Sequence, residues 1–112
     1  MSLEENKILV RRFVEAVNQR DFRVVDEVLH PDYVLTSRNE TLHGAEEYKK
    51  AVQELASRVS AFHFTVQDMV AEGDRVAYTW LYQEIKGGQE TSRVGITLLR
   101  IAEGKIIEDR YW

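Results

Sequence analysis

The stretch FHFTVQDMVAEGDRVAYTWLYQEI, residues 62–85, decides how the second half of the chain folds. Large apolar side chains occupy alternating positions on both sides of the Gly73-Asp74 pair, namely Phe62, Phe64, Val66, Val76, Tyr78, Trp80 and Tyr82. Alternation of period two predicts strands with one buried face, and a Gly-Asp pair between two such runs predicts a turn. The stretch is therefore predicted to be a hairpin of two long antiparallel strands.

Two further strands are predicted after this hairpin. The segments ETSRVGITLLRI (residues 90–101) and KIIEDRYW (residues 105–112) are strand-like, and glycine-containing turns at Gly87-Gly88 and Gly104 precede them. Short glycine-containing connections between such runs are typical of hairpins. The second half of the chain is therefore predicted to be a four-stranded antiparallel meander.

The first half of the chain has a helical pattern. Apolar residues recur at helical spacing in three segments, residues 2–19, 22–30 and 45–62. Ser2 and Glu5 fit a capping box at the first helix, Pro31 is expected to end the second, and YVLTS at residues 33–37 is predicted to be a short strand. Helices and strands that are segregated along a chain indicate the α+β class.

Composition and charge exclude several classes of protein. At 112 residues, 44% of them hydrophobic, the chain is expected to form one domain. The formal net charge of -4 argues against nucleic-acid binding, which needs a concentrated basic surface. There is no cysteine and no pair of histidines at metal-ligand spacing, so neither thiol chemistry nor a metal site is expected. No apolar run approaches a membrane span and the N-terminus is acidic, which favours a cytoplasmic protein.

Four fragments of the chain resemble one known family. They are HPDYV (residues 30–34), HGAEEYKKAV (43–52), DMVAEGDRVAYTW (68–80) and RIAEGKIIEDRYW (100–112). In this order the chain resembles the SnoaL-like polyketide cyclase branch of the nuclear transport factor 2-like superfamily. The resemblance implies a single SnoaL-like domain over residues 1–112 with a cystatin-like α+β roll. In that roll, three N-terminal helices cover the concave face of a cone-shaped, mixed or antiparallel sheet.

The resemblance also implies a kind of site and an assembly. Cyclases of this type use an acid–base pair in the cone-shaped pocket to move a proton next to a carbonyl group, with neither metal nor cofactor. The ligand is then a small apolar molecule. Members frequently form dimers through the outer face of the sheet, so a homodimer is expected. Leu81 and Leu99 are expected to be exposed apolar residues on that outer face.

The aromatic row of the first hairpin is a candidate ligand-binding surface. Tyr78, Trp80 and Tyr82 share a face, and we expect them to point into the cone. Such residues are usually core, yet buried tyrosine hydroxyls and tryptophan indoles need hydrogen-bond partners. We therefore expect the inner part of this row to pack in the core and the part at the mouth of the cone to bind a ligand. Tyr33, on the short strand, is also expected to reach the pocket.

The last strand carries a second group of candidates. Alternation places Glu108, Arg110 and Trp112 on one face, and the resemblance favours this face as the one that lines the pocket. Glu108 and Arg110 are then close enough to form a structural ion pair, or Arg110 can anchor an anion or carbonyl. In the family, a tryptophan stands at the position of Arg110 and a catalytic aspartate follows four places later, beyond Trp112.

Two acids remain as candidate proton carriers, Asp68 and Glu108. Asp68 shares the apolar face of Phe64 and Val66 if the alternation holds, whereas a bulge before the turn would point it outward. His30 is expected to be structural at a helix end, and His63 to face solvent or a partner.

Two functions are compatible with these features. One is a domain that binds a small apolar, carbonyl-bearing molecule and isomerises, cyclises or hydrolyses it by general acid–base chemistry without a cofactor. The other is a non-catalytic dimerisation or ligand-binding domain.

Overall fold

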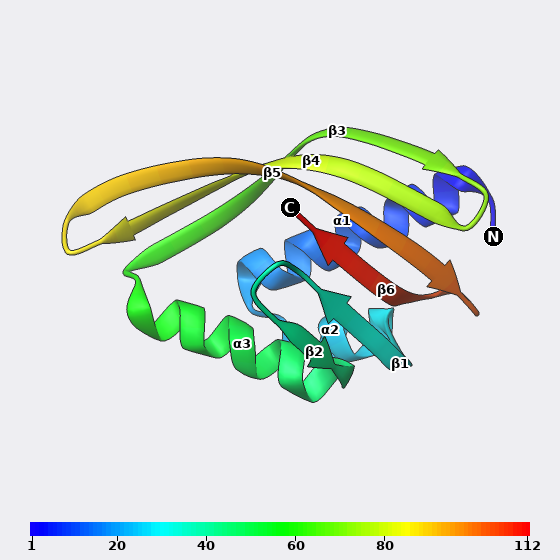
Figure 1. Ribbon diagram of the computed structural model, residues 1–112, viewed down its shortest axis with the longest axis horizontal. Coiled ribbons are helices and arrows are strands. Elements are labelled where there is room, and N and C mark those ends of the chain that lie inside the picture. The colour runs from blue at the N-terminus through cyan, green and yellow to red at the C-terminus, as the bar shows by residue number, and fades with distance from the viewer.

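Three helices pack against a six-stranded sheet (Figure 1) in the computed structural model, which describes all 112 residues. The helices are α1 (Leu3–Gln19), α2 (Phe22–Val28) and α3 (Gly44–Arg58). The strands are β1 (Leu29–Thr36), β2 (Thr41–His43), β3 (Ala61–Glu72), β4 (Arg75–Lys86), β5 (Gln89–Ala102) and β6 (Lys105–Tyr111). The predicted α+β class is confirmed.

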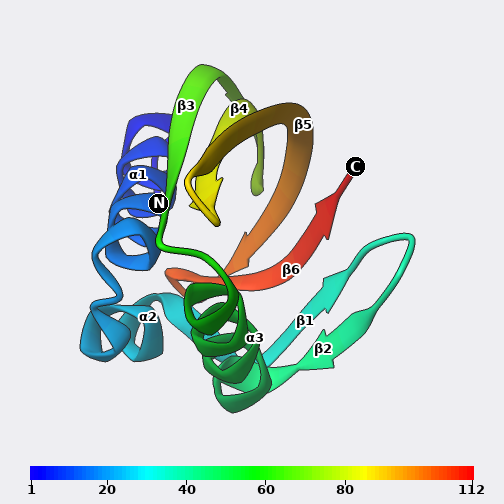
Figure 2. The same ribbon diagram turned by 90° about the vertical axis from the view of Figure 1, so that its left-hand side faces the viewer.

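The sheet is mixed and curls without closing. Its strand order is β2-β1-β6-β5-β4-β3, with β1 and β6 parallel and every other neighbouring pair antiparallel. Figure 2 shows the long strands β3, β4 and β5 arching over the side on which α1 and α3 lie. The predicted meander is β3 to β6, and β1 and β2 extend it beyond β6. A concave surface covered by helices is the result.

Helix α1 begins at the predicted capping box. The Glu5 amide donates to the Ser2 hydroxyl at 3.0 Å, and the Ser2 amide donates to Glu5 Oε1 at 2.9 Å. These two bonds satisfy backbone donors that the first turn leaves unpaired. The buried face of the helix then carries its apolar residues at helical spacing: Leu9, Val10, Phe13, Val14, Ala16 and Val17.

Two helices are shorter than the sequence predicts. Helix α2 ends at Val28, because Leu29 is already in β1 and pairs in parallel with Ile106 of β6. His30 is therefore in a strand, where its Nδ1 accepts the amide of Asp32 at 3.0 Å. Helix α3 ends at Arg58, and the residues predicted as its last turn enter β3 from Ala61 onward. Burial in the sheet outweighs local helical spacing at both boundaries.

A bulge interrupts the alternation of β3. Val66 is opposite Trp80 of β4, whereas Asp68 is opposite Thr79, so Gln67 is an extra residue. An extra residue reverses which face every later side chain occupies. Met69 consequently takes the inward position and Asp68 is exposed.

A second bulge interrupts β6. Arg100 of β5 is opposite Glu108, whereas Ile101 is opposite Ile106, so Ile107 is the extra residue. Ile106 and Asp109, three residues apart, are therefore both buried, at 0% and 4% exposure. The uninterrupted alternation predicted for this strand is wrong, and its two faces are exchanged after Ile107.

Gly95 allows a tryptophan to lie flat against the sheet. Gly95 of β5 is directly opposite Trp80 of β4. A Cβ atom at Gly95 would overlap the six-membered ring of Trp80 and would lie 2.5 Å from the backbone oxygen of Trp112. Gly95 is thus required by the close approach of an aromatic ring.

The buried apolar residues form one core cluster between helices and sheet. Leu99 belongs to it with 0% exposure, so the prediction that Leu99 lies on the outer face is wrong. Its neighbour Val76 is equally buried. None of the three helices is long and apolar enough to cross a membrane.

Candidate functional site

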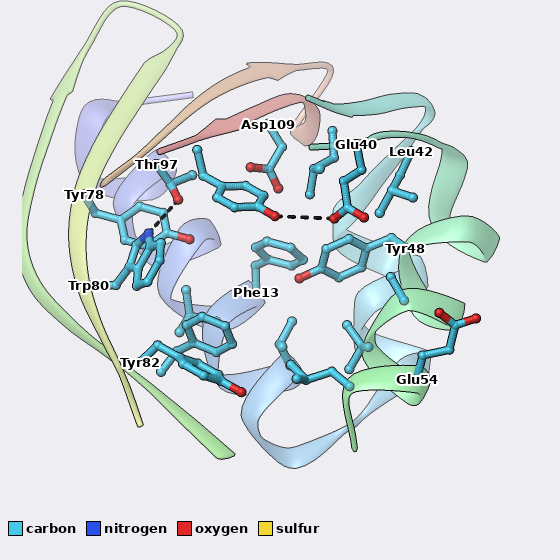
Figure 3. A pocket seen from close by; sticks show the side chains of 18 of the residues that line it. Phe13, Glu40, Leu42, Tyr48, Glu54, Tyr78, Trp80, Tyr82, Thr97 and Asp109 are labelled. Atoms are coloured by element: carbon cyan, nitrogen blue, oxygen red, sulfur yellow. Dashed lines mark hydrogen bonds between the residues drawn. The ribbon is translucent and has the colours of Figure 1, made fainter. Parts of the chain in front are cut away.

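A cavity of about 310 Å³ lies between the concave side of the sheet and the helices (Figure 3). We call it the main cavity. It is lined by 20 residues, 14 of them hydrophobic, which is the composition expected of a site for an apolar ligand. Its apolar wall includes Phe13 and Val17 of α1, Val52 and Leu55 of α3, and Phe64 of β3.

Asp109 of β6 is the one buried carboxyl group among the three acids that line the main cavity. Its side chain is buried, and its Oδ2 accepts a hydrogen bond from the Tyr33 hydroxyl at 2.6 Å. Burial raises the pKa of Asp109 from 3.8 to about 6, while the Tyr33 hydrogen bond acts in the opposite direction. Asp109 can therefore gain or lose a proton near neutral pH, as a general acid or base must.

Two tyrosines face the space beside Asp109. Tyr48 of α3 and Tyr78 of β4 both line the main cavity. Burial, and next the negative charge of Asp109, raise the pKa of both hydroxyls, so both stay protonated and act as donors. Figure 3 shows the Tyr48 hydroxyl directed into the cavity, and it forms no side-chain hydrogen bond with the protein. Tyr48 is thus a donor available to a ligand.

The other two predicted aromatic residues of β4 also line the main cavity, but their polar atoms have partners. Trp80 Nε1 donates to Thr97 Oγ1 at 2.9 Å. The Tyr82 hydroxyl donates to Glu84 Oε1 at 2.8 Å. These bonds hold the rings in place, so Trp80 and Tyr82 offer a ligand mainly apolar surface. Whether Tyr78, Trp80 and Tyr82 bind a ligand stays a prediction.

Tyr33 acts through Asp109 and does not line the main cavity. Its side chain is 1% exposed, and its ring packs edge-on against that of Tyr48 at 5.7 Å between centroids. Because its hydroxyl donates to Asp109, Tyr33 positions the carboxyl group. The prediction that Tyr33 itself reaches the pocket is therefore wrong, since Tyr33 contacts Asp109 and, of these two, only Asp109 lines the cavity.

The pocket-facing orientation predicted for the last strand is wrong. The bulge at Ile107 turns Glu108, Arg110 and Trp112 to the outer side of the sheet, and none of them lines the main cavity. Glu108 pairs with Arg100 at 2.9 Å, and this bond lowers the pKa of Glu108. Arg110 is exposed, and Trp112 is 65% exposed. The predicted Glu108–Arg110 ion pair is not formed.

The orientation predicted for Asp68 on the apolar face is wrong as well. The bulge at Gln67 turns Asp68 outward, where its amide donates to the Thr79 hydroxyl at 3.1 Å. The outward alternative, in which a bulge precedes the turn, is the one observed. Asp68 is exposed and is not part of the main cavity.

Sequence reasoning misses Asp109 and Tyr48 as site residues. Uninterrupted alternation assigns Asp109 to the outer face, because the bulge has no clear signature in the pair Ile106-Ile107. Helical spacing identifies Tyr48 only as part of the buried stripe of its helix. The sequence feature that could have identified Tyr48 is its hydroxyl group, since a buried hydroxyl on an otherwise apolar helix face needs a hydrogen-bond partner.

The arrangement is suited to proton transfer on an apolar molecule. Asp109 can carry a proton, and Tyr48 can donate a hydrogen bond to an oxygen that gains negative charge. No group of three or more His, Asp or Glu side chains is placed to hold a metal ion.

Comparison with known proteins identifies a family and a set of folds that this chain resembles. The SnoaL-like domain family matches residues 10–109 of the chain. No curated protein matches the sequence significantly.

Several solved structures share the fold. An NTF2-like protein of unknown function from Burkholderia pseudomallei is 19% identical with a TM-score of 0.88, over 100% of this chain and 91% of that one. IdmH, a candidate polyketide cyclase from Streptomyces antibioticus, is 20% identical with a TM-score of 0.86, over 96% and 90%. An LEH-like epoxide hydrolase from M. tuberculosis is 21% identical with a TM-score of 0.85, over 97% and 78%. Identities this low establish the fold alone.

Proposed function

We propose that this chain, which belongs to the SnoaL-like domain family, binds a small, mainly apolar molecule with a carbonyl group in the main cavity and moves a proton next to that carbonyl. The observation that carries the proposal is the position of Asp109, a buried carboxyl group on an apolar cavity wall. Carboxyl groups are seldom buried, and one with a perturbed pKa in a cavity is a candidate for a functional site. The pKa of about 6 gives both protonation states at neutral pH.

Each residue has a defined part in the proposed reaction. The Asp109 carboxylate removes a proton from the carbon next to the carbonyl group, and the negative charge moves to the carbonyl oxygen. Tyr48 donates a hydrogen bond to that oxygen and stabilises the enolate. Protonated Asp109 then delivers a proton to the enolate. Delivery to the same carbon, after the Asp109 proton has exchanged with water, gives hydrogen exchange. Delivery to the far carbon of a conjugated dienolate, where the substrate has a second double bond, gives isomerisation. Tyr33 holds the carboxyl group in place at 2.6 Å.

The relatives support a small-molecule site in this fold. A candidate polyketide cyclase and an epoxide hydrolase share it, and both names describe chemistry on small organic molecules. The size of the proposed substrate is argued from the cavity of this chain, whose volume of about 310 Å³ suits a molecule of about two fused rings.

Hydrogen–deuterium exchange of 2-tetralone tests this function. The compound is apolar, has two rings and carries acidic protons next to its carbonyl group. In D2O, the protein is expected to accelerate exchange, and Asp109→Asn is expected to reduce the rate by about a hundredfold or more. Asp68→Asn, which removes an exposed carboxylate outside the cavity, is the matched control and should keep the wild-type rate.

The pH profile adds a second criterion. The exchange rate is expected to rise with pH through an apparent pKa near 6, since the base is the ionised form of Asp109. Exchange that is no faster than in buffer, or that survives in Asp109→Asn, contradicts the proposal.

A homodimer is proposed from a separate observation, the exposed apolar outer face of the sheet. Val94 and Ile96 of β5 and Val70 of β3 are 69%, 43% and 66% exposed. Val94 is directly opposite Leu81 of β4, so the apolar surface is continuous across neighbouring strands. Apolar surface of this kind marks protein–protein contacts.

If Asp109 proves to have no catalytic part, a dimeric ligand-binding domain is the second candidate function.

Light scattering coupled to size exclusion checks the dimer. The wild type is expected to elute as a dimer at micromolar concentration, and Val94→Lys as a monomer. A monomeric wild type under these conditions contradicts the homodimer but leaves the cavity chemistry unaffected.

A further inference from the structure

A second, polar hollow adjoins the main cavity at the end marked by Tyr82. Its volume is about 330 Å³, and only three of its nine lining residues are hydrophobic. We call it the vestibule. Leu55, Arg58, Tyr82 and Arg93 line both spaces, so the vestibule lies directly beside the main cavity. A ligand in the main cavity can therefore extend into the vestibule.

Positive charge is concentrated in the vestibule. Its lining includes three cations, Arg58, Lys86 and Arg93, and one carboxylate, Glu84. None of these cations lies within 4.0 Å of a carboxylate, in contrast to Lys49 and Arg100 elsewhere in the chain. The whole chain has a net charge of -4, so a surplus of cations here opposes the general trend.

The contacts of Tyr82 show where the positive charge of the vestibule lies. The Arg93 guanidinium lies over the Tyr82 ring at 5.2 Å, and Glu84 accepts the Tyr82 hydroxyl at 2.8 Å. Burial and Glu84 raise the pKa of Tyr82, while the charges of Arg93 and Arg58 oppose that rise. The Arg93 guanidinium thus lies at Tyr82, and Arg58 lines the same junction of the two spaces.

Two of the three acids that line the main cavity lie at the opposite end. Figure 3 shows Asp109 and Glu40 together at one end of the main cavity and Tyr82 at the other. Glu40 accepts the Tyr111 hydroxyl at 3.4 Å. The third acid of the lining, Glu54, is on α3 one turn before Arg58, and Figure 3 shows it away from Asp109 and Glu40. Glu54, Arg58 and Arg93 are all exposed. An anionic group on a ligand is repelled at the Asp109 end and attracted at the vestibule.

We propose that the ligand is amphipathic, with an apolar body in the main cavity and a singly charged oxyanion, such as a carboxylate, in the vestibule between Arg58 and Arg93. Guanidinium groups suit such a partner because their planar forks bind two oxygens at once. The charge fixes the direction in which the ligand enters, so its uncharged end lies beside Asp109. This inference rests on the proposed small-molecule function and narrows its substrate class to organic acids.

A matched pair of fluorescent probes tests the inference. The probes are 8-anilino-1-naphthalenesulfonate and N-phenyl-1-naphthylamine, which share one aromatic body and differ in the sulfonate. The wild type is expected to bind the sulfonate more tightly. In the double variant Arg58→Gln/Arg93→Gln, the Kd of the sulfonate is expected to rise by about tenfold. The Kd of the uncharged probe is expected to stay within about twofold, because neither arginine pairs with it.

Two controls make the result specific to the vestibule. Arg11→Gln/Arg23→Gln removes the same charge from exposed positions on α1 and α2 and should leave both Kd values unchanged. Ala51→Phe fills the main cavity and should weaken both probes, which shows that they bind there and not on the outer face. Circular dichroism and thermal melting establish that each variant is folded.

The outcomes separate the inference from the proposed function. If the wild type binds both probes with equal affinity, or the Arg58→Gln/Arg93→Gln variant loses the same affinity for both, the proposal that the ligand is anionic is wrong. The proposed small-molecule function is then unaffected. Failure of the wild type to bind either probe overturns the small-molecule function, and this inference with it.

Discussion

Replacing Asp109 by asparagine is expected to change stability in a pH-dependent way. Asparagine has nearly the same shape and can still accept the Tyr33 hydrogen bond, but it cannot ionise. In the wild type, ionisation of a buried carboxyl group opposes folding. The folded-state pKa of about 6, against 3.8 for a free aspartate, measures that cost.

The magnitude follows from linkage. The folded state binds more protons at Asp109 than the unfolded state between pH 3.8 and about 6, so the Asp109 contribution to stability is present at low pH and lost as pH rises through this window. At pH 8 the full shift costs about 3 kcal/mol, and at pH 5 about 1.6 kcal/mol. The asparagine side chain of the variant avoids this cost but leaves an amide N–H group to be satisfied, a penalty of about 1–3 kcal/mol that does not vary with pH.

Urea denaturation of wild type and variant measures this difference, with fluorescence of the buried Trp80 as the signal. The free energy of unfolding of Asp109→Asn, relative to wild type, is expected to increase by about 1.4 kcal/mol from pH 5 to pH 8. Asp68→Asn changes an exposed carboxyl group and should show no comparable trend. A difference that is independent of pH, or that becomes smaller at pH 8, refutes the assignment of Asp109 as a buried acid with a raised pKa.

Three other variants test the framework of the site. Gly95→Ala is expected to lower stability by about 1–3 kcal/mol, because the added methyl group displaces the Trp80 ring; an unchanged melting temperature would contradict the close packing. Thr97→Val removes the acceptor of the Trp80 indole and should cost about 1–3 kcal/mol in urea denaturation, whereas no loss would mean that the bond is dispensable. Glu108→Gln breaks the half-exposed pair with Arg100 and should cost less than about 1 kcal/mol, with probe binding unchanged; a loss of binding would place Glu108 in the site after all.

The fold could be predicted largely from alternation and turn residues. Tyr78, Trp80 and Tyr82 on one side of β4 are directed inward because nothing interrupts that strand. Glycine turns at Gly73 and Gly104 join neighbouring strands as expected. The resemblance to SnoaL-like proteins added the curvature of the sheet and the cover of helices, which alternation alone does not contain.

The candidate acids could not be placed from the sequence, because each lies just after a bulge. A bulge shifts the alternation by one residue, so every later side chain changes face. Ile106 and Ile107 are the same residue type, so either could fill the buried position. The local sequence therefore does not indicate which of them is the extra residue of the bulge. The same event at Gln67 moved Asp68 outward. Parallel pairing of β1 with β6 brings Tyr33 to Asp109, which is 76 positions later in the sequence, and no local pattern indicates so distant a pairing.

Nuclear Overhauser effects from N-phenyl-1-naphthylamine to the protein show where an apolar ligand binds. We expect contacts between the probe and the ring protons of Tyr48 and Trp80, which line the main cavity. Contacts confined to the methyl groups of Val94 and Ile96 would place the probe on the outer face of the sheet and contradict a ligand-binding cavity beside Asp109.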